Sequence, residues 1–581
     1  MDIRTYLKDN LLLFDGGMGT LCAEKIPESV GSPCELLNLT HPEQIAAIHK
    51  EYIEAGSKAI KTNTFGANVL AMDTVTCRQV IETGFKIADK FAGEAYIFAD
   101  IGPISVTDSG DINEQYRLVI DMFLNCGAVN FIFETGSSLD GLQFAADYIK
   151  AKSPDSFIIL SFAAMPDGFT RSGQSAARLI KQAAELDSVD AVGLNCASGA
   201  RHMAKLAAEL PRISKYLSVM PNAGYPTVLG NRTFYDGDPS YFGRQIASIA
   251  ANGARIVGGC CGTTPEHIAA AYKSLKVPHA APITVKSDIK KQTVSNEFFD
   301  ELCNPAKRPI AVELDPPENA DIAQFMSGAK ALKEYGASVI TIADCPIARA
   351  RMDSSILACK LHRELGIGVL PHLTCRDRNL NAIKALLLGL CAEGVHNILT
   401  VTGDPIPSAS RDEVKSVYNF NSRMLAGYIT ALGEQSLPAP FHIFGALNVN
   451  ARNFDVQLRI AAEKEANGVC GFLTQPVLTE QAVENLKRAR ATLKGKILGG
   501  IFPIVSHKNA CFLNSEVAGI AVSDEIIAMY EGADREKGEE LAVKISANIA
   551  NIIHGYTDGY YLITPFSRTK LIGRIIKEIS G

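Results

Sequence analysis

The sequence lacks the segments that would direct a protein into a membrane or out of the cell. No apolar run approaches the roughly 18 residues that a membrane-spanning helix needs. Residues 1–10 are polar and contain no apolar core of a signal peptide. These absences predict a cytoplasmic protein that does not use a membrane as a partner.

The sequence also lacks a basic stripe. Its net charge is −6, and no long run of one sign interrupts the chain. Nucleic acid is not expected as a partner, because binding its phosphate backbone requires clustered Lys and Arg. Hydrophobic residues make up 47% and charged residues 21%, a balance that is typical of soluble globular proteins.

Three short motifs are missing as well. There is no C-x-x-C pair, which argues against a structural four-cysteine zinc site. Neither half of the chain carries G-x-G-x-x-G after its first strand, and no P-loop is present. The main rival architecture, an open doubly wound sheet in each half, is disfavoured for that reason. In a cytoplasmic chain the 14 cysteines are expected to be reduced thiols, metal ligands or core residues.

What the sequence does contain is a regular βα pattern. Short apolar runs rich in Val, Ile and Phe alternate with longer stretches of helical periodicity, as in a parallel sheet. Eight such units in about 280 residues match a TIM barrel. The expected strand ends are near Phe14, Thr62, Ala99, Phe133, Phe162, Leu194, Met220 and Val257, and then near Glu313, Ile342, His372, Val401, Ala446, Thr474, Ile501 and Ile563.

The predicted fold class is therefore α/β, with two (β/α)8 TIM barrels joined by a linker. Residues 277–296 contain two prolines, several lysines and little periodicity, which is typical of a linker. We expect a first barrel over residues 1–280, a linker over 281–299 and a second barrel over 300–581.

Functional side chains in such barrels lie at the C-terminal ends of the strands. In the first half, Cys196 ends the sixth strand, and the adjacent Cys260 and Cys261 follow a Gly-Gly pair at the end of the eighth. Three sulfurs can converge there on a zinc ion with one open position, at which a substrate thiol would lose its proton. The alternative is that these are ordinary buried cysteines of the core.

The segments around these cysteines closely resemble the homocysteine methyltransferase family over roughly residues 1–280. They are residues 15–20 (DGGMGT), 193–196 (GLNC) and 258–265 (GGCCGTTP). The resemblance implies that Cys196, Cys260 and Cys261 bind zinc and that homocysteine is the substrate whose sulfur takes the fourth position.

The same resemblance assigns a substrate-binding set. Asp15 and Glu134 match the acidic residues that hold the substrate amino group, and the N–H groups of Gly16 and Gly17 suit its carboxylate. Asn195, inside the second motif, is assigned to the same site. The alternatives are a turn residue for Asp15 and a solvated rim charge for Glu134.

The second half has no metal-like cluster, but polar motifs again follow its strands. These motifs are Glu313 with Asp315-Pro316-Pro317, and residues 371–377 (PHLTCRD), 402–405 (TGDP), 474–476 (TQP) and 500–503 (GIFP). Together they closely resemble methylenetetrahydrofolate reductase over roughly residues 300–581. That family implies FAD as cofactor, NAD(P)H as reductant and methylenetetrahydrofolate as substrate.

The reductase resemblance implies roles for individual residues. Glu313 matches the general acid that assists opening of the folate ring, a task that suits a carboxyl with a raised pKa. Asp404 matches an acidic residue near flavin and pterin, and Gln475 a residue that hydrogen-bonds the pterin. The expected FAD contacts are His372, Gly403, Asp404, Tyr418 and Lys464.

Two of those assignments have plain alternatives, and two positions depart from the family. His372 could be a packed residue and Lys464 a solvated helix charge. His507 stands where well-known members have an aromatic residue, and Thr402 where they have an arginine. These departures leave nucleotide stacking and part of the FAD contact set unassigned.

Other readings of the whole chain stay open. The second barrel could be a flavoprotein for another substrate, or one barrel could be an inactive scaffold. No D-x-H-x-x-G corrinoid signature is present, so the expected methyl donor is a sulfonium compound or a methylcorrinoid protein. The choice of NADH or NADPH and the oligomeric state are open, and a homo-oligomer is one option.

Overall fold

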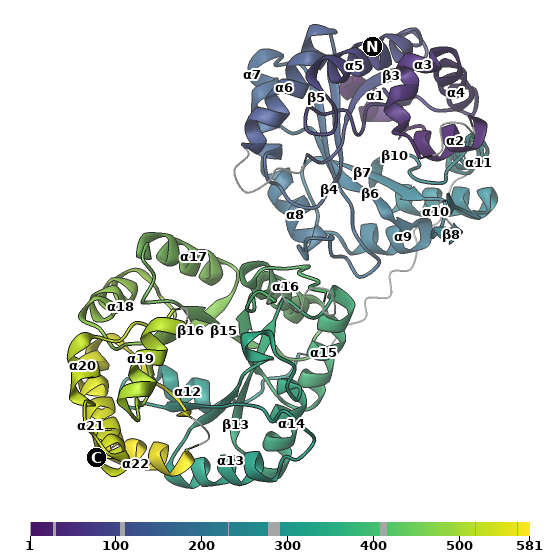
Figure 1. Cartoon of the computed structure of the whole chain (residues 1–581). Coiled ribbons are helices and arrows are strands. Elements are labelled where there is room, and N and C mark those ends of the chain that lie inside the picture. Colours follow the sequence, from purple (N-terminus) through teal and green to yellow (C-terminus); the bar gives the residue numbers. More distant parts are fainter. Residues whose placement is uncertain are drawn as a thin grey trace. The chain divides into compact units, whose positions relative to one another are not determined.

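The computed structural model of the chain describes residues 2–26, 31–104, 111–229, 232–276, 291–406, 415–517, 519–565 and 568–580. It divides into two compact units, Met1–Lys286 and Ser287–Gly581. In each unit the strands gather at the centre and the helices surround them (Figure 1). Residues 277–290, most of the expected linker, lie outside the described residues.

The eight strands expected in the first unit are all present and form a parallel sheet. Its order is β1-β10-β7-β6-β5-β4-β3-β2, and a parallel bridge between Phe14 and Ala59 joins its two edges. The strands are β1 (Leu12–Leu13), β2 (Ala59–Lys61), β3 (Tyr96–Ile101), β4 (Asn130–Gly136), β5 (Phe157–Phe162), β6 (Ala191–Gly199), β7 (Tyr216–Asn222) and β10 (Ala254–Val257).

Helices follow these strands and pack against the outside of the barrel. A short antiparallel hairpin, β8 (Thr227–Leu229) with β9 (Arg232–Phe234), follows β7 and was not expected from the sequence. The helices are α2 (Met18–Lys25), α3 (Leu37–Thr40), α4 (Pro42–Glu54), α5 (Thr74–Asp89), α6 (Ile112–Asn125), α7 (Leu142–Lys152), α8 (Ala176–Ala184), α9 (Ala200–Glu209), α10 (Pro239–Ala251) and α11 (Pro265–Leu275).

The second unit is a closed parallel barrel whose eight strands follow one another in sequence order. Each lies where the sequence predicts it. They are β11 (Ile310–Leu314), β12 (Val339–Ile342), β13 (Gly368–Thr374), β14 (Asn397–Val401), β15 (His442–Leu447), β16 (Val469–Pro476), β17 (Lys496–Ile501) and β18 (Gly559–Ile563). The outer helices are α13 (Ala323–Tyr335), α14 (Ser354–Leu365), α15 (Leu380–Ala392), α16 (Ser422–Gln435), α17 (Phe454–Ala466), α18 (Glu480–Thr492), α19 (His507–Glu516), α20 (Asp524–Met529), α21 (Arg535–Ile553) and α22 (Thr569–Ser580).

A short helix closes the N-terminal end of the first barrel. It lies in a segment for which the sequence predicted no helix. Helix α1 (Ile3–Asp9) buries Ile3 and Leu7 among the residues that fill the barrel. Arg4 fixes it by donating to the carboxylate of Asp190 and to the backbone carbonyl of Ser156, just before β6 and β5. The N-terminal end of the barrel is therefore closed.

A second plug helix begins inside the range expected to be linker. Helix α12 (Glu297–Cys303) packs Phe298 and Leu302 against the interior of the second barrel. Its N-cap residue, Asn296, hydrogen-bonds Asn397 at the first position of β14. With the N-terminal end of each barrel closed, polar groups at the opposite rim are the ones left to meet a ligand.

In the part of the chain that the structure describes, no helix is both long enough and apolar enough to span a membrane.

Candidate active sites at the two barrel rims

Three cysteines come together at the C-terminal rim of the first barrel. The Sγ atoms of Cys196, Cys260 and Cys261 all lie within 4.8 Å of one another, and those of Cys196 and Cys261 are 3.7 Å apart. Sulfurs bound tetrahedrally to one zinc at 2.3 Å are separated by roughly 3.8 Å. The donor set and its spacing therefore fit a zinc ion.

Local backbone geometry explains why the sulfurs converge. The β6 ladder shifts register between Asn195 and Gly199, and Cys196 and Ala197 adopt left-handed φ angles of 56° and 58°. In the segment that follows β10 and carries the other two cysteines, a Cβ on Gly259 would lie 2.2 Å from the Thr263 hydroxyl. Glycine is needed there because the segment packs tightly against its own turn.

The three thiols are electrostatically coupled. Hydrogen bonds from the Cys260 and Cys261 thiols hold the pKa of Cys196 far below its ordinary value. The bond to Cys196 raises the pKa of Cys260 in return, and burial adds to that increase. A bound dication would stabilise all three sulfurs as thiolates.

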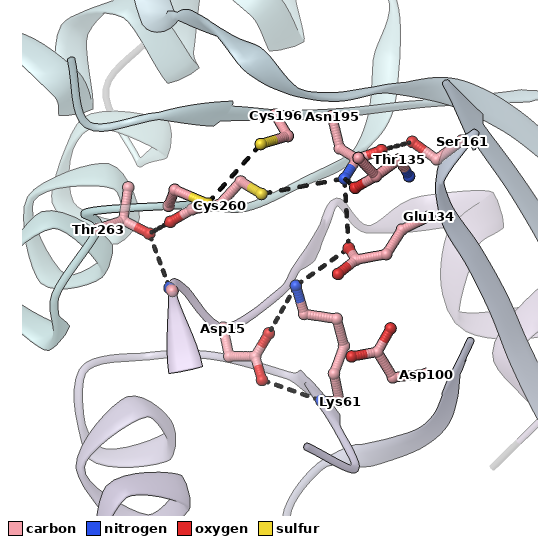
Figure 2. Close-up of polar contacts among 12 residues, drawn as sticks. Asp15, Lys61, Asp100, Glu134, Thr135, Ser161, Asn195, Cys196, Cys260 and Thr263 are labelled. Atoms are coloured by element: carbon pink, nitrogen blue, oxygen red, sulfur yellow. Dashed lines mark hydrogen bonds and ion pairs between the residues drawn. The ribbon is translucent and has the colours of Figure 1, made fainter. Parts of the chain in front are cut away.

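Beside the sulfurs lies an acidic pocket, which we define as Asp15, Asp100 and Glu134 with Lys61 (Figure 2). All four side chains are buried, with Asp15 only 1% and Glu134 7% exposed. The reading of Glu134 as a solvated rim charge is therefore wrong. The Lys61 ammonium lies 3.3 Å from Glu134 Oε2 and 3.9 Å from Asp15 Oδ1.

The pocket holds more negative than positive charge. Burial raises the pKa of Asp15 to about 7, although Lys61 opposes the shift, and burial also raises the pKa of Asp100 well above its usual value. Burial alone would lower the pKa of Lys61, but Glu134, Asp15 and Asp100 together keep it well above its usual value. Among the described residues, Asp15 Oδ1 and Asp100 Oδ1 accept no hydrogen bond. Two buried acceptors are therefore available to a cationic ligand.

Asn195 links the acidic pocket to the sulfurs. Its Nδ2 lies 3.4 Å from Glu134 Oε2 and 3.9 Å from Cys260 Sγ, while its Oδ1 accepts from the Thr135 N–H and the Ser161 hydroxyl. Figure 2 shows this amide between the carboxylate and the sulfur. Asn195 is fully buried, so it orients Glu134 relative to the cysteines.

The two glycines after β1 differ in what they offer a ligand. The Gly17 N–H donates to both the carbonyl and the hydroxyl of Thr263, at 3.1 and 3.0 Å. Within the described residues, Gly16 N–H has no such acceptor, and it is the better candidate donor to a substrate carboxylate. The Asp15 side chain accepts from the Lys61 N–H at 2.9 Å, so it links β1 to β2.

Replacing Lys61 by Met is expected to destabilise the protein by about 3–5 kcal/mol near pH 8, because buried carboxylates lose their counter-charge. The loss should be smaller at pH 5. The pKa of Asp15 is about 7 in the folded chain and 3.8 in a model peptide, so its folded carboxyl is protonated at pH 5 and stability falls as pH rises toward 7. Urea unfolding at both pH values measures the difference.

The matched control is Lys58→Met, which changes an exposed lysine next to the same strand and should cost less than about 0.5 kcal/mol. Equal losses for Lys61→Met at the two pH values would contradict the charge-balance argument.

In the second barrel, Glu313 lies at the end of β11 with its side chain 16% exposed. Burial raises its pKa to about 7, and the hydroxyl of Tyr561 donates to its Oε2. His372 Nε2 lies 3.7 Å from the same oxygen and has no hydrogen-bond partner among the residues that the structure describes. Burial lowers the pKa of His372 to about 3, so the ring is neutral. Glu313 has the environment of a carboxylic acid that holds its proton near neutral pH.

Asp404, which follows β14, is held by residues in the loops after β12 and β13. Its Oδ2 accepts from the Ile347 N–H at 2.9 Å, and its carbonyl accepts from the Arg376 guanidinium at 3.2 Å. Ile347, Ala348 and Tyr418 all have left-handed φ angles, a conformation that costs energy in residues other than glycine. Arg376 is almost fully buried and was not singled out from the sequence.

The structure also describes the other residues of this barrel that the sequence singled out. Lys464 on α17 is buried and donates to the Ala446 carbonyl at 2.8 Å, so the solvated-charge reading is wrong. Burial lowers its pKa to about 8. Gly403 has φ +92°, and a Cβ there would lie 3.2 Å from Arg376 and Thr374. Gln475 is in β16, and His507 opens α19 with a contact to Cys511.

Lys61, Tyr561 and Arg376 are the site residues that sequence reasoning missed. Lys61 and Tyr561 lie within apolar strands, where the hydrophobic pattern of the strand predicts buried core residues. Arg376 lies inside the PHLTCRD segment, so its motif was noticed although its structural role was not.

Each of the two units matches a different family of known proteins. Residues 12–275 match the family model described as homocysteine S-methyltransferase, and residues 299–579 match that described as methylenetetrahydrofolate reductase. A methionine synthase of Mycobacterium tuberculosis is 30% identical over 307 residues, which cover 48% of this chain and 26% of that protein. The chain thus spans about a quarter of the length of this curated relative.

Among solved structures, the homocysteine methyltransferase MmuM from Escherichia coli is similar in two forms. The metallated form is 21% identical with a TM-score of 0.38, covering 46% of this chain and 98% of that one. The oxidized form is 21% identical with a TM-score of 0.39, covering 47% and 99%. The two family models thus place on one chain a region that matches homocysteine S-methyltransferases and a region that matches methylenetetrahydrofolate reductases.

Proposed function

We propose that the protein is a bifunctional one-carbon enzyme. Its first barrel transfers a methyl group to homocysteine to give methionine. Its second barrel uses FAD and NAD(P)H to reduce 5,10-methylenetetrahydrofolate to 5-methyltetrahydrofolate. The observation that carries the proposal is the placement of three convergent sulfurs and a buried acidic pocket on one rim.

In the first barrel, Cys196, Cys260 and Cys261 would hold zinc. When bound, zinc supplies an open position at which a substrate thiol is deprotonated and becomes a nucleophile. The acidic pocket lies within reach of the same substrate, since Asn195 contacts both Glu134 and Cys260. Asp15 Oδ1, which accepts no hydrogen bond among the described residues, and the carboxylate of Glu134 would accept the α-ammonium, and the Gly16 N–H would donate to the substrate carboxylate.

In the second barrel, FAD would be contacted by His372, Gly403, Asp404, Tyr418 and Lys464, and it supplies the hydride when bound. Glu313 provides the proton that a bridging amine nitrogen of the folate needs before its ring can open. Its raised pKa suits that role, because the carboxyl still carries a proton near neutral pH. Gln475 would hydrogen-bond the pterin, whose ring edge mixes donors and acceptors.

Metal and flavin analysis of the purified chain, with each activity assayed separately, tests the proposal. We expect about one zinc per chain, a yellow protein and oxidation of NAD(P)H that depends on methylenetetrahydrofolate. A colourless chain that lacks both cofactors would contradict the proposed chemistry in both barrels.

The purified protein should not make methionine from homocysteine and methyltetrahydrofolate alone. The folate methyl sits on a neutral tertiary amine, which is a poor leaving group, and the sequence carries no D-x-H-x-x-G corrinoid signature to relay it. Methionine should form when S-methylmethionine, S-adenosylmethionine or a methylated corrinoid protein is supplied, because those methyl carbons are electrophilic. Product analysis by mass spectrometry with each donor in turn makes the comparison.

The control for that experiment is a corrinoid-free preparation, verified by its absorbance spectrum. Robust methionine formation from methyltetrahydrofolate by such a preparation would overturn the donor assignment.

A further inference from the structure

The carboxyl group of Glu313 has two oxygens in unequal surroundings. Oε2 accepts the hydrogen bond from Tyr561 and is also the oxygen 3.7 Å from His372 Nε2. In the described part of the chain, Oε1 takes part in no comparable contact. The side chain remains 16% exposed, so Oε1 is the oxygen available to a ligand.

The pairing of two neighbouring strands places Tyr561 beside Glu313. Strands β11 and β18 pair in parallel, with Ala311 opposite Tyr561 and Glu313 opposite Ile563. Residues two apart on a strand share a face, so Tyr561 and Glu313 point into the same barrel interior from neighbouring strands. Tyr561 is 7% exposed and packs in the interior cluster with Ala311 and Leu370. Its hydroxyl therefore has a fixed position.

The Tyr561 hydroxyl is the donor in its hydrogen bond with Glu313. Burial raises the pKa of Tyr561 well above its usual range, and the nearby Glu313 raises it further. Tyr561 thus keeps its proton throughout the working pH range. His372 cannot compete as a charged donor, because its ring is neutral and its nitrogen is too distant for a hydrogen bond.

We propose that Tyr561 is a positioning residue for Glu313: its hydroxyl holds Oε2 as an acceptor, so that the transferable proton resides on Oε1. This inference rests on the proposed role of Glu313 as the acid of the reductase. In the transfer, the O–H bond at Oε1 breaks, an N–H bond forms on the bridging amine, and Glu313 becomes a carboxylate. The Tyr561 O–H stabilises that carboxylate at Oε2, which makes Glu313 a stronger acid than it would be alone.

The groups that face Glu313 fix the sign of the expected pH effect. Burial raises its pKa, the Tyr561 hydrogen bond lowers it, and the charge of Asp315 on the same segment raises it. His372 on β13 is neutral. Removing the Tyr561 hydroxyl should therefore raise the pKa of Glu313, and the rate should begin to fall at a higher pH than in the wild type.

The test is Tyr561→Phe, studied by stopped-flow flavin absorbance in the full-length holoenzyme. Flavin reduction by NAD(P)H should stay within about twofold of wild type. Reoxidation by methylenetetrahydrofolate should fall by about 10–100-fold, the range for a hydrogen bond to a charged group. The alkaline limb of the reoxidation rate should shift to higher pH.

The matched control is Tyr560→Phe on the same strand. Tyr560 points to the opposite face and contacts the Ala550 carbonyl and His554, so its loss should leave both half-reactions and the pH limb unchanged. A second check is Tyr561→Phe in a Glu313→Gln background, where it should have no further effect because the proton it positions is gone.

Each outcome is decisive. An unchanged alkaline limb in Tyr561→Phe, equal losses in both half-reactions, or an additive loss in the Glu313→Gln background would overturn the positioning role. A wild-type enzyme that does not reduce methylenetetrahydrofolate would instead overturn the proposed function. A Glu313→Gln variant with wild-type reoxidation would remove the acid on which the inference rests.

Discussion

Cys260→Ala will abolish methyl transfer to homocysteine and leave the reductase activity intact. Cys260 is the most buried of the three sulfurs and is the one that Asn195 contacts. Losing it leaves two sulfurs for zinc, and even a change in the groups supporting a metal ligand typically costs 10–100-fold. We expect a loss of more than about 100-fold in methionine formation, together with reduced zinc content measured by elemental analysis.

The control is Cys77→Ala, which alters a buried cysteine in the core-facing side of α5 and should leave zinc content unchanged. Folate reduction by the second barrel serves as an internal check on the same preparation. Full zinc occupancy in a variant that lacks Cys196, Cys260 and Cys261 together would show that the metal lies elsewhere.

Glu313→Gln will retain FAD and its reduction by NAD(P)H but will lose folate reduction. Glutamine keeps the shape of the side chain and removes the transferable proton, and general acid catalysis is typically worth about 10²–10⁴ in rate. In the proposed mechanism the protonated carboxyl of Glu313 is the active form. Its pKa of about 7 therefore predicts that flavin reoxidation slows as pH rises through neutrality.

Stopped-flow measurement of the two half-reactions separates these effects. Glu318→Gln is a suitable control, since Glu318 is exposed and pairs with Arg351 outside the strand. A Glu313→Gln variant that reoxidises its flavin within twofold of the wild-type rate would remove Glu313 from the mechanism.

The sixteen barrel strands could be predicted from the sequence because β-branched runs and helical periods alternate so regularly. The convergence of Cys196 with Cys260 and Cys261 followed from their places at strand ends, and the structure brings these sulfurs together. Their role in binding zinc remains a prediction. Helix α1 was missed although Ile3 and Leu7 lie four residues apart after the N-cap Asp2, because a helix of seven residues is too short to show a clear helical period.

Other site features had no signal in the sequence. Lys61 ends an apolar strand, and only the fold brings it to Asp15 and Glu134 from separate strands. The Tyr561 hydroxyl meets Glu313 across a separation of 248 residues. A pairing of this kind depends on barrel closure and strand register, which local patterns do not encode.

The plug helix of the first barrel has a consequence for how that barrel folds. Arg4 contacts Asp190, 186 residues away, and Arg255 donates to the Leu7 carbonyl across 248 residues. Helix α1 therefore acquires these partners only after nearly all of the barrel that follows it has been synthesised. Contacts of such high order carry a large loop-closure cost and form slowly. Docking of α1 should therefore be a late folding event. Until the barrel closes, the apolar side chains of Ile3 and Leu7 should stay exposed and able to bind chaperones.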